Sequence, residues 1–530
     1  MTAADATVRS IDAVCAATGQ VLRRVPVATP DQLEVALRRA RQAQRDWGSR
    51  PVRERLRALR PVLGLMVERR DAIARLISQE TGKPRFEALS AEVLPTLDLL
   101  DYYLDHAEEI LAPEPVPHRL LKTTRSVILH EPHGVVGVIT PWNYPFFLTA
   151  GIALGALVAG NAVLNKPSEF TPLVGLDFEK LLRDAGVPPA LYQCLPGYGD
   201  LGAALVEAGC DKISFTGSVR TGRKVAAACG ERLIPVTVEL GGKDPAIVLE
   251  DADLDRAVRS ICWGAFTNAG QVCASIERVF VHEAIAPQFT QRLVEEARKL
   301  RQGHDRAFDV DLGPMVNRMQ YEVVSQQVEE ARAKGAKILL GGSGRPGTGE
   351  KGGYFFEPTI VSETRSDMAV QCQETFGPVL TVVPVAGEEE AIRRANDSPY
   401  GLTASVWTRD ERTGDRVARR LHCGSVFVND TLIPSGAGEV PWGGVKDSGY
   451  GKTRGPQGLR AMCRIKHVAH DRFGMRDAPV WFPYTPEKYR LVSELIPVLF
   501  AKGAVRRVRA GVAGLRNVVF GMWGRNDGKP

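Results

Sequence analysis

The chain has 530 residues, of which 44% are hydrophobic and 25% are charged. This composition is typical of a globular protein and argues against a disordered, collagen-like or membrane-spanning chain. The net charge of +6 lies in the segment 489–530, which carries eight Lys or Arg and two acidic residues. The rest of the chain is balanced, which does not suit a nucleic-acid-binding protein.

Cysteine and histidine patterns give no sign of a metal or of disulfides. The nine cysteines include no Cys-x-x-Cys pair, and the nine histidines show no metal-binding spacing. Residues 1–20 lack the apolar stretch of a signal peptide, and no window reaches the length of a transmembrane helix. We therefore expect a cytoplasmic protein without a bound metal.

Apolar periodicity predicts the elements in chain order. Residues 30–111 repeat apolar side chains near every 3.6 positions, which predicts an amphipathic helical lead-in. A proline-rich stretch at 113–119 precedes a strand-like arm at 121–130. After Gly134, short apolar runs alternate with helical segments, as in buried parallel strands joined by crossover helices. The first series of runs is 135–140, 162–165, 192–195, 212–215 and 236–238, and the second is 246–249, 278–281, 338–340, 379–383, 403–407 and 425–428. We predict an α/β protein with two doubly wound domains.

Two glycine-rich stretches match nucleotide-binding motifs only in part. Residues 197–202 match the pattern G-x-G-x-x-G after a predicted strand, but no acidic residue ends the next strand to take a ribose hydroxyl. A tight strand-to-helix turn is the alternative interpretation. Residues 448–453 end like a P-loop but lack its first glycine, so we expect no ATP site there.

A glutamate and a cysteine stand where chemistry is possible. Glu239 ends an apolar strand and precedes two glycines that let backbone approach closely. Cys273 follows 34 residues later, where a helical pattern gives way to a strand. Each alone has a structural interpretation, because most cysteines are small buried hydrophobes and most strand-end glutamates are solvated or capping charges.

Together with other motifs, these residues resemble the aldehyde dehydrogenase superfamily, from about Ile11 to Phe473. The motifs occur in the order that the family shows. They are Thr140-Pro141-Trp142-Asn143-Tyr144-Pro145, Lys166-Pro167-Ser168-Glu169, Phe215-Thr216-Gly217-Ser218, Val238-Glu239-Leu240-Gly241-Gly242-Lys243, Phe266-Thr267-Asn268-Ala269-Gly270-Gln271-Val272-Cys273, Glu374-Thr375-Phe376-Gly377-Pro378 and Pro441-Trp442-Gly443-Gly444-Val445-Lys446.

The resemblance implies a non-acylating, NAD(P)-dependent enzyme that oxidises aldehydes. Cys273 is the expected nucleophile, because a thiolate attacks a carbonyl effectively near neutral pH. The Asn143 side-chain amide and the Cys273 backbone N–H are expected to hold the oxyanion. Glu239 is expected to activate the water that hydrolyses the thioester. This glutamate favours an acid-forming enzyme over a relative that passes the acyl group to coenzyme A.

The resemblance also assigns the cofactor contacts. Lys166 and Glu169 are expected at the adenosine ribose, Ser218 with Trp142 near the pyrophosphate, and Glu374 with Phe376 around the nicotinamide ribose and ring. Further expected contacts are Thr140, Pro141, Ser168, Gly199, Phe215, Gly217 and Leu240. A carboxylate at Glu169 accepts from ribose hydroxyls and repels a 2′-phosphate, which favours NAD over NADP, although Lys166 could serve either.

The expected substrate tunnel departs from that of many relatives. Gly151 stands where many carry an aromatic residue and where succinic semialdehyde enzymes can carry an arginine. Gly436 occupies a second position where aromatic residues are common. Tyr144, Phe147 and Val272 complete the expected lining. The glycines predict a wide, uncharged tunnel, unless residues such as Phe147 refill the space.

Such a tunnel suits a medium-chain, long-chain or aromatic lipophilic aldehyde. A succinic semialdehyde or other semialdehyde dehydrogenase is the alternative within the family. A catalytically silent membrane-associated or structural relative is the alternative outside it, and the intact Cys273, Glu239 and Asn143 speak against that. Motifs do not name the aldehyde, because specificity depends on the shape of the tunnel.

The resemblance divides the chain into parts. Residues 1–114 and 134–238 are expected to form a Rossmann-like NAD-binding domain, and 239–455 a second Rossmann-like, catalytic domain. Residues 115–133 and 456–473 are the expected arm that joins subunits into a homodimer or tetramer. Residues 474–530 are a basic amphipathic extension. We predict that 489–523 contacts an anionic membrane peripherally or that the extension gates the substrate tunnel of a neighbouring subunit, with packing on its own protomer or dimer partner as the alternative.

Overall fold

A computed structural model describes residues 9–119, 121, 124–346, 353–472, 478 and 480–500 of the protein. Contacts within the chain divide it into two units. The larger joins the residues up to Pro113 with Leu129–Lys466, and the smaller joins Glu114–Ile128 with the chain after Lys466.

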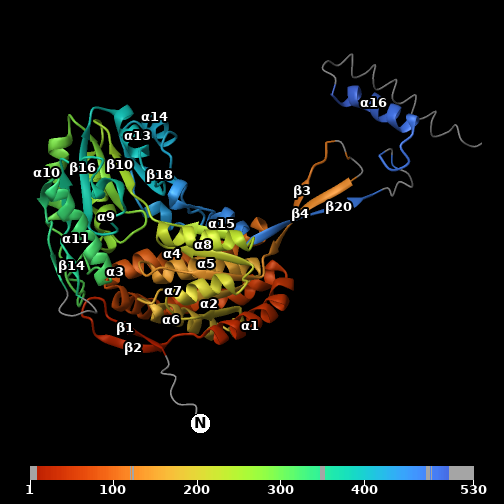
Figure 1. Ribbon diagram of the computed structural model, residues 1–530, viewed down its shortest axis with the longest axis horizontal. Coiled ribbons are helices and arrows are strands. Elements are labelled where there is room, and N and C mark those ends of the chain that lie inside the picture. The colour runs from red at the N-terminus through yellow and green to blue at the C-terminus, as the bar shows by residue number, and fades with distance from the viewer. Residues whose placement is uncertain are drawn as a thin grey trace, which may run out of the picture. The chain divides into compact units, whose positions relative to one another are not determined.

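A six-stranded sheet forms the first half of the larger unit (Figure 1). Its strands are β5 Val135–Ile139, β6 Ala162–Lys166, β7 Tyr192–Cys194, β8 Lys212–Thr216, β9 Val236–Glu239 and β19 Gly449–Tyr450. In the order β19-β9-β8-β5-β6-β7, every neighbouring pair except β19 and β9 is parallel. All five strands predicted for this sheet are present, because their apolar runs are buried on both faces.

The second sheet has seven strands in the order β12-β15-β16-β11-β10-β17-β18. They are β10 Asp244–Val248, β11 Ile276–His282, β12 Lys337–Leu340, β15 Thr359–Ser362, β16 Val379–Val385, β17 Thr403–Trp407 and β18 Ser425–Val428. The predicted doubly wound fold is confirmed, since β16-β11-β10-β17-β18 repeats the parallel order of the first sheet. Strand β15 was not predicted, because only Ile360 and Val361 in it are apolar, and β12 pairs with it in the antiparallel sense.

Helices cover both faces of the second sheet (Figure 1). Its helices are α9 Leu254–Phe266, α10 Ala286–Ala297, α11 Arg318–Ala333, α12 Ala369–Cys372, α13 Glu388–Asn396 and α14 Glu411–Ala418. Alternate strand residues serve opposite faces: Val248 packs with α9 and α10, and Ile247 packs with α13 and α14. The crossover helices of the first sheet are α5 Pro145–Ala159, α6 Pro172–Asp184, α7 Gly199–Glu207 and α8 Val219–Glu231.

The predicted helical lead-in packs against the first sheet. It contains α1 Pro30–Ser49, α2 Val52–Thr81, α3 Arg85–Ala88, the π-helical turn η1 Leu89–Val93 and α4 Leu94–Ile110, after an unpredicted hairpin of β1 Ser10–Val14 and β2 Val21–Pro26. Trp47, Met66 and Tyr103 are fully buried in the core that these helices share with α5. Because α5 is apolar on almost every side, it is enclosed, and its N-terminus is held firmly near the site described below.

Short elements complete the larger unit. They are η2 Pro189–Leu191, η3 Thr267–Gly270, β13 Gly344–Arg345, β14 Phe355–Phe356, η4 Ile433–Gly436, η5 Lys446–Ser448 and α15 Gly455–Ala461. Two of these segments depart from the predicted domain boundaries. Strand β19, within the predicted catalytic range 239–455, pairs with β9 of the first sheet. Helix α15, at the start of the predicted arm segment 456–473, contacts α4 and α5.

The smaller unit holds the parts of the predicted arm before Leu129 and after Lys466, together with the beginning of the extension. The strand predicted near 121–130 is found as β4 Thr124–Pro132, and the second predicted arm segment, 456–473, contains β20 Cys463–Asp471. With β3 Glu114–Val116 they form a sheet of order β20-β4-β3. Helix α16 Pro486–Phe500 follows and has no buried residue. Residues 501–523 of the predicted membrane segment lie outside the described residues. Every helix within the described ranges is too short or too polar to cross a membrane.

Candidate active site

Most residues expected to bind a dinucleotide lie where neighbouring parallel strands of the first sheet end. In strand order these are Thr140, Pro141 and Trp142 after β5, Lys166, Ser168 and Glu169 at the end of β6, Phe215, Gly217 and Ser218 at the end of β8, and Leu240 after β9. The strand order reverses between β5 and β8. In open α/β sheets, ligands bind in the crevice at such a switch point.

Gly199 lies apart from this group. It begins α7, which follows the edge strand β7. A Cβ at the preceding Gly197 would lie 2.4 Å from Leu201. The G-x-G-x-x-G stretch therefore serves a tight strand-to-helix turn, at a distance of two strands from the switch point.

The backbone between β8 and α8 suits a pyrophosphate. Ser218 caps α8, and its hydroxyl accepts from the Thr221 N–H at 3.4 Å. A helix N-terminus with free N–H groups attracts phosphate oxygens. A Cβ at Gly217 would lie 2.7 Å from the Phe215 ring, so glycine is needed at this turn. The donors and glycines present here fit a dinucleotide.

Lys166 and Glu169 form an ion pair at the expected adenosine end. The Lys166 Nζ lies 3.4 Å from Glu169 Oε2. Lys166 is buried, which lowers its pKa, and the charge of Glu169 opposes that change. Glu169 is partly exposed, so its carboxylate is accessible to ribose hydroxyls, whereas the hydroxyl of Ser168 accepts from the Phe170 N–H within the turn.

At the opposite end, Trp142 and Phe376 meet edge to face, with ring centroids 5.5 Å apart. Glu374 accepts from the Gly242 N–H at 3.0 Å. A Cβ at Gly241 would lie 2.2 Å from the Glu374 carboxylate, so only glycine allows this approach. The residues expected around the nicotinamide thus lie together.

A buried ion pair holds the loop that carries Glu374 and Phe376. Glu277 accepts from the backbone N–H groups of Thr375 and Phe376, both at 2.9 Å. Lys243 pairs with Glu277 and donates to the Thr375 hydroxyl at 3.0 Å. These contacts restrain Phe376, whose φ of 52° is left-handed.

Asn143 is fastened at both its backbone and its side chain. Its carbonyl accepts from Lys83 Nζ at 2.7 Å and from Asn268 Nδ2 at 3.0 Å. Its side-chain amide donates to the Gln271 carbonyl at 3.0 Å, which leaves the second amide N–H for another acceptor. Lys83 also pairs with Glu92 in η1 at 2.7 Å, with both side chains 0% exposed.

The loop before Cys273 contains left-handed backbone conformations that side-chain hydrogen bonds stabilise. Asn268 and Ala269 have φ of 52° and 54°. Glu87 in α3 accepts from the Asn268 N–H at 3.0 Å and from the Thr267 hydroxyl at 2.8 Å. The helical lead-in therefore supplies the buried Lys83 and Glu92 and the partly buried Glu87, which support the predicted catalytic residues.

Glu239 is buried beside Cys273 and Trp442. Burial raises its pKa to about 7, against the lowering by the Cys273 thiol and the Trp442 indole N–H. That N–H lies 3.4 Å from Glu239 Oε1, and Oε2 has no hydrogen-bond partner among the described residues. A carboxylate of this kind is suited to take a proton near neutral pH.

The Cys273 side chain is only partly exposed. Burial raises the pKa of its thiol well above the ordinary value, and the carboxylates of Glu239, Asp244 and Glu374 add to that rise. The resting group is therefore a thiol that needs a base. Its backbone N–H makes no hydrogen bond within the described chain, so it remains available to an oxyanion.

A pocket leads to Glu239, and its lining corrects the predicted tunnel. It is lined by Phe147, Leu148, Gly151, Ile152, Thr216, Glu239, Trp442, Thr453 and Arg454. The prediction of an uncharged tunnel is wrong, because the charged residue Arg454 lies on its wall. Arg454 is 303 residues from Gly151 along the sequence. No sequence motif near Arg454 predicts that it lies in this pocket.

The predicted width of the tunnel is not seen either. The cavity of about 10 Å³ holds about one water molecule. A Cβ at Gly151 would lie 3.3 Å from Leu99 Cδ2, so a neighbouring helix already packs against that glycine. Tyr144, Val272 and Gly436 are not among the described residues that line this cavity; Tyr144 lies under Lys83 instead, 3.9 Å from Nζ to the ring centroid.

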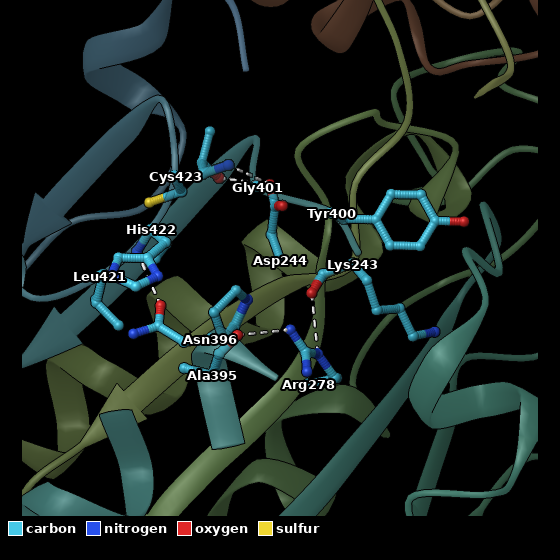
Figure 2. A pocket seen from close by; sticks show the side chains of 13 residues that line it. Lys243, Asp244, Arg278, Ala395, Asn396, Tyr400, Gly401, Leu421, His422 and Cys423 are labelled. Atoms are coloured by element: carbon cyan, nitrogen blue, oxygen red, sulfur yellow. Dashed lines mark hydrogen bonds between the residues drawn. The ribbon is translucent and has the colours of Figure 1, made fainter. Parts of the chain in front are cut away.

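A second small pocket lies among Asp244, Arg278, His422 and Cys423 (Figure 2). Its polar groups are engaged: Arg278 Nε donates to the Lys243 carbonyl at 2.9 Å, and Asp244 accepts from the Thr403 hydroxyl at 2.6 Å. Burial raises the pKa of Asp244 to about 8. Its described lining contains neither Cys273 nor Glu239 nor Asn143, so we do not place the reaction here.

Sequence comparison identifies relatives along nearly the whole chain. The model of the "Aldehyde dehydrogenase family" matches residues 2–468. A relative from Mycobacterium tuberculosis, named "Putative succinate-semialdehyde dehydrogenase [NADP(+)] 2", is 39% identical over 478 residues, which cover 90% of this chain and 91% of the relative. The 4,4'-diapolycopene aldehyde oxidase of a Methylomonas species is 38% identical over 499 residues, covering 94% and 92%.

Solved structures give the same result. The NAD+ complex of an aldehyde dehydrogenase from Bacillus cereus superposes with a TM-score of 0.83 at 35% identity, covering 87% of this chain and 93% of that one. The NAD+ complex of a Mycobacterium tuberculosis aldehyde dehydrogenase has a TM-score of 0.83 at 31% identity, covering 87% and 95%. On this fold, these motifs and these relatives, the chain belongs to the aldehyde dehydrogenase family.

Proposed function

We propose that the protein oxidises an aldehyde to the carboxylic acid with NAD, through a thioester on Cys273. The observation that supports this function is the placement of the Cys273 thiol beside Glu239, a buried carboxylate with a pKa of about 7 and a free oxygen. The Cys273 thiol, which needs a base, thus lies next to a carboxylate that takes up and releases a proton near neutral pH.

In the first stage, Glu239 accepts the thiol proton and the Cys273 sulfur attacks the carbonyl carbon. The oxyanion that forms accepts from the free Asn143 amide N–H and the Cys273 backbone N–H. Bound NAD, with its nicotinamide end held near Glu374 and Phe376, would supply the acceptor for the hydride that leaves the tetrahedral carbon. The carbon remains joined to Cys273 as a thioester.

Before the second stage, Glu239 releases the thiol proton to solvent. It then removes a proton from water, and the water oxygen attacks the thioester carbon. The C–S bond breaks, the carboxylic acid leaves, and Cys273 recovers its proton. Glu239→Gln tests this role at alkaline pH, where the Cys273 thiol can ionise without a base: it should form one NADH per active site and then stall as acyl-enzyme. Absence of both the burst and the acyl-enzyme mass would contradict the base role.

We propose NAD as the preferred cofactor. Glu169 puts a negative charge where NADP carries its 2′-phosphate, although Lys166 lies 3.4 Å away and partly compensates. The mycobacterial relatives are named for NADP, whereas the Bacillus cereus structure holds NAD+. Measured kcat/KM values for the two cofactors decide between them.

For the substrate, we propose an aldehyde with an apolar body. Phe147, Leu148, Ile152 and Trp442 give the pocket apolar walls. The similarity to a diapolycopene aldehyde oxidase supports this choice. Its match of 499 residues is longer than residues 1–473, so it covers part of the extension. A semialdehyde is the second candidate, and the observation that favours it is Arg454.

We further propose a homo-oligomer formed through β20. This nine-residue strand is an edge of its sheet, and most of its residues are exposed, including Ile465 at 72%. Long exposed edges are usually covered by another strand. Light scattering of the protein and of Ile465→Pro tests this, since a proline in the middle of β20 should disrupt strand pairing and lower the mass.

A further inference from the structure

Arg454 and the expected base Glu239 lie on the walls of the same small cavity. Both residues are buried, since Arg454 is 8% exposed and Glu239 is 3% exposed. Neither forms an ion pair with another described residue. The cavity of about 10 Å³ has room for about one water molecule, so little solvent screens the two opposite charges from each other.

The indole of Trp442 connects the two residues. Its N–H donates to Glu239 Oε1 at 3.4 Å, and the Arg454 guanidinium lies over its ring, 5.2 Å from the centroid. The guanidinium also lies over the Phe147 ring, at 4.9 Å. Aromatic faces attract a cation but carry no charge that would neutralise it. The positive charge of Arg454 therefore remains available to act on Glu239.

The backbone at Arg454 is costly to maintain. Its φ of 60° and ψ of 174° lie in a region that glycine normally occupies. Strain of this kind at a non-glycine residue persists where the surroundings enforce it, and it concentrates at functional sites. One guanidinium N–H donates to the Ser435 carbonyl, which restrains the side chain further. The guanidinium thus has a defined position beside the cavity.

Arg454 is the cation among the charged groups that act on Glu239. Burial raises the pKa of Glu239 to about 7, and the charge of Arg454 is one of the influences that oppose this rise. The other ionisable neighbours of Glu239 are acids, the Cys273 thiol and the Glu374 carboxyl group. Around Arg454 lie Tyr103 of α4, Glu239 and Cys273. Burial lowers the pKa of Arg454 only to about 10, so the guanidinium stays charged at neutral pH.

Building on the function proposed above, we propose that Arg454 is a positioning residue that keeps Glu239 ionised between its two proton transfers. Glu239 takes the thiol proton first and must release it to solvent before it takes a proton from water. A nearby cation favours the carboxylate over the protonated acid and therefore favours that release. Because the charge of Arg454 acts through the base, oxidation of a neutral aldehyde depends on it as much as oxidation of a charged one.

The experiment measures decay of the acyl-enzyme by mass spectrometry of quenched samples. The acyl-enzyme is formed with butanal and NAD at alkaline pH and is then mixed rapidly to a final pH from about 5 to 10. In the unmodified protein the hydrolysis rate should rise with a midpoint near 7, as the Glu239 pKa of about 7 implies. Removing a neighbouring cation raises the pKa of a carboxyl group, so with Arg454→Met the midpoint should move to about 8 or higher. Hydrolysis at pH 6 should then be about tenfold slower, whereas the two rates should converge at alkaline pH.

Matched variants separate the charge of Arg454 from its packing. Arg454→Lys keeps the positive charge and should return the midpoint most of the way to 7. Arg460→Met is the control, because this arginine is exposed, lies on α15 and is outside the pocket lining, so the midpoint should stay near 7. If Arg454→Met fails to fold, Arg454→Gln takes its place. In the unmodified protein, infrared difference spectra against Glu239→Gln report the Glu239 carboxyl group, which must be ionised at pH 8.

A purely structural role for Arg454 makes a different prediction. Because Arg454 supports the Ser435 carbonyl, its loss would then loosen that loop and slow hydrolysis by the same factor at every pH. Such a uniform loss overturns the proposal, as does the same shift of the midpoint in Arg460→Met or a protonated Glu239 at pH 8 in the unmodified protein. A loss confined to aldehydes that carry a carboxylate also overturns it. Failure of the unmodified protein to oxidise any aldehyde at any pH instead overturns the proposed function.

Discussion

Replacing Lys83 by methionine tests how the helical lead-in supports the active site. Lys83 and Glu92 are completely buried, with Nζ and Oε1 2.7 Å apart. The second Glu92 oxygen accepts from the N–H groups of Phe146 and Phe147 at 2.8 and 3.2 Å. Lys83→Met would leave that carboxylate buried without its cation. Breaking such a pair from one side costs about 3–5 kcal/mol of unfolding free energy.

Urea unfolding of Lys83→Met, Glu92→Gln and the double variant measures this cost. Because the double variant no longer buries an unpaired charge, its loss should be smaller than the sum of the single losses by about 1–3 kcal/mol. Lys180→Met removes an exposed lysine from an ion pair with Asp184 and is the control, with little change expected.

Lys83→Met should also affect the reaction rate. Lys83 donates to the Asn143 carbonyl, so its loss should let the oxyanion amide move and lower kcat by about 10- to 100-fold, less than the full loss of an oxyanion donor. The reasoning is refuted if Lys83→Met is no more destabilising than Lys180→Met, or if the single effects at Lys83 and Glu92 simply add.

Further predictions concern the nucleophile, the base, the cofactor and the extension. Cys273→Ala should abolish NADH formation while NAD still binds in a fluorescence titration, and residual turnover would exclude Cys273 as the nucleophile. Glu239 acts when ionised and has a pKa of about 7, so thioester hydrolysis should fall about tenfold per pH unit below 7; a flat single-turnover profile from pH 5 to 8 would exclude it. Glu169→Gln should raise the NADP to NAD ratio of kcat/KM by roughly tenfold, since it removes a charge near the 2′-phosphate, and an unchanged ratio would place that ribose elsewhere. Truncation after Phe473 should reduce pelleting with anionic liposomes, and equal pelleting would exclude membrane contact by the extension.

The fold was largely predictable because its signals are local. Runs such as 212–215 and 403–407 are apolar because both faces of a parallel sheet are buried, and each is found as a strand. Elements with weak local patterns were missed, such as β15 with two apolar residues. The residues that the motifs nominated also come together: Cys273 lies beside Glu239, Asn143 donates to the Gln271 carbonyl two residues before Cys273, and most expected cofactor residues lie at neighbouring strand ends. Their catalytic and binding roles stay predictions.

The residues around those motifs depended on the tertiary structure. Leu99 packs against Gly151 and fills the space beside it, so the glycine does not widen the pocket. Lys83 and Glu92 look like ordinary charges of a helical segment, yet they are buried under Asn143. Arg454 reaches the pocket from a segment far along the chain. Local patterns report whether a segment is buried and which element it forms, whereas the charge and volume of a pocket depend on side chains that only folding brings together.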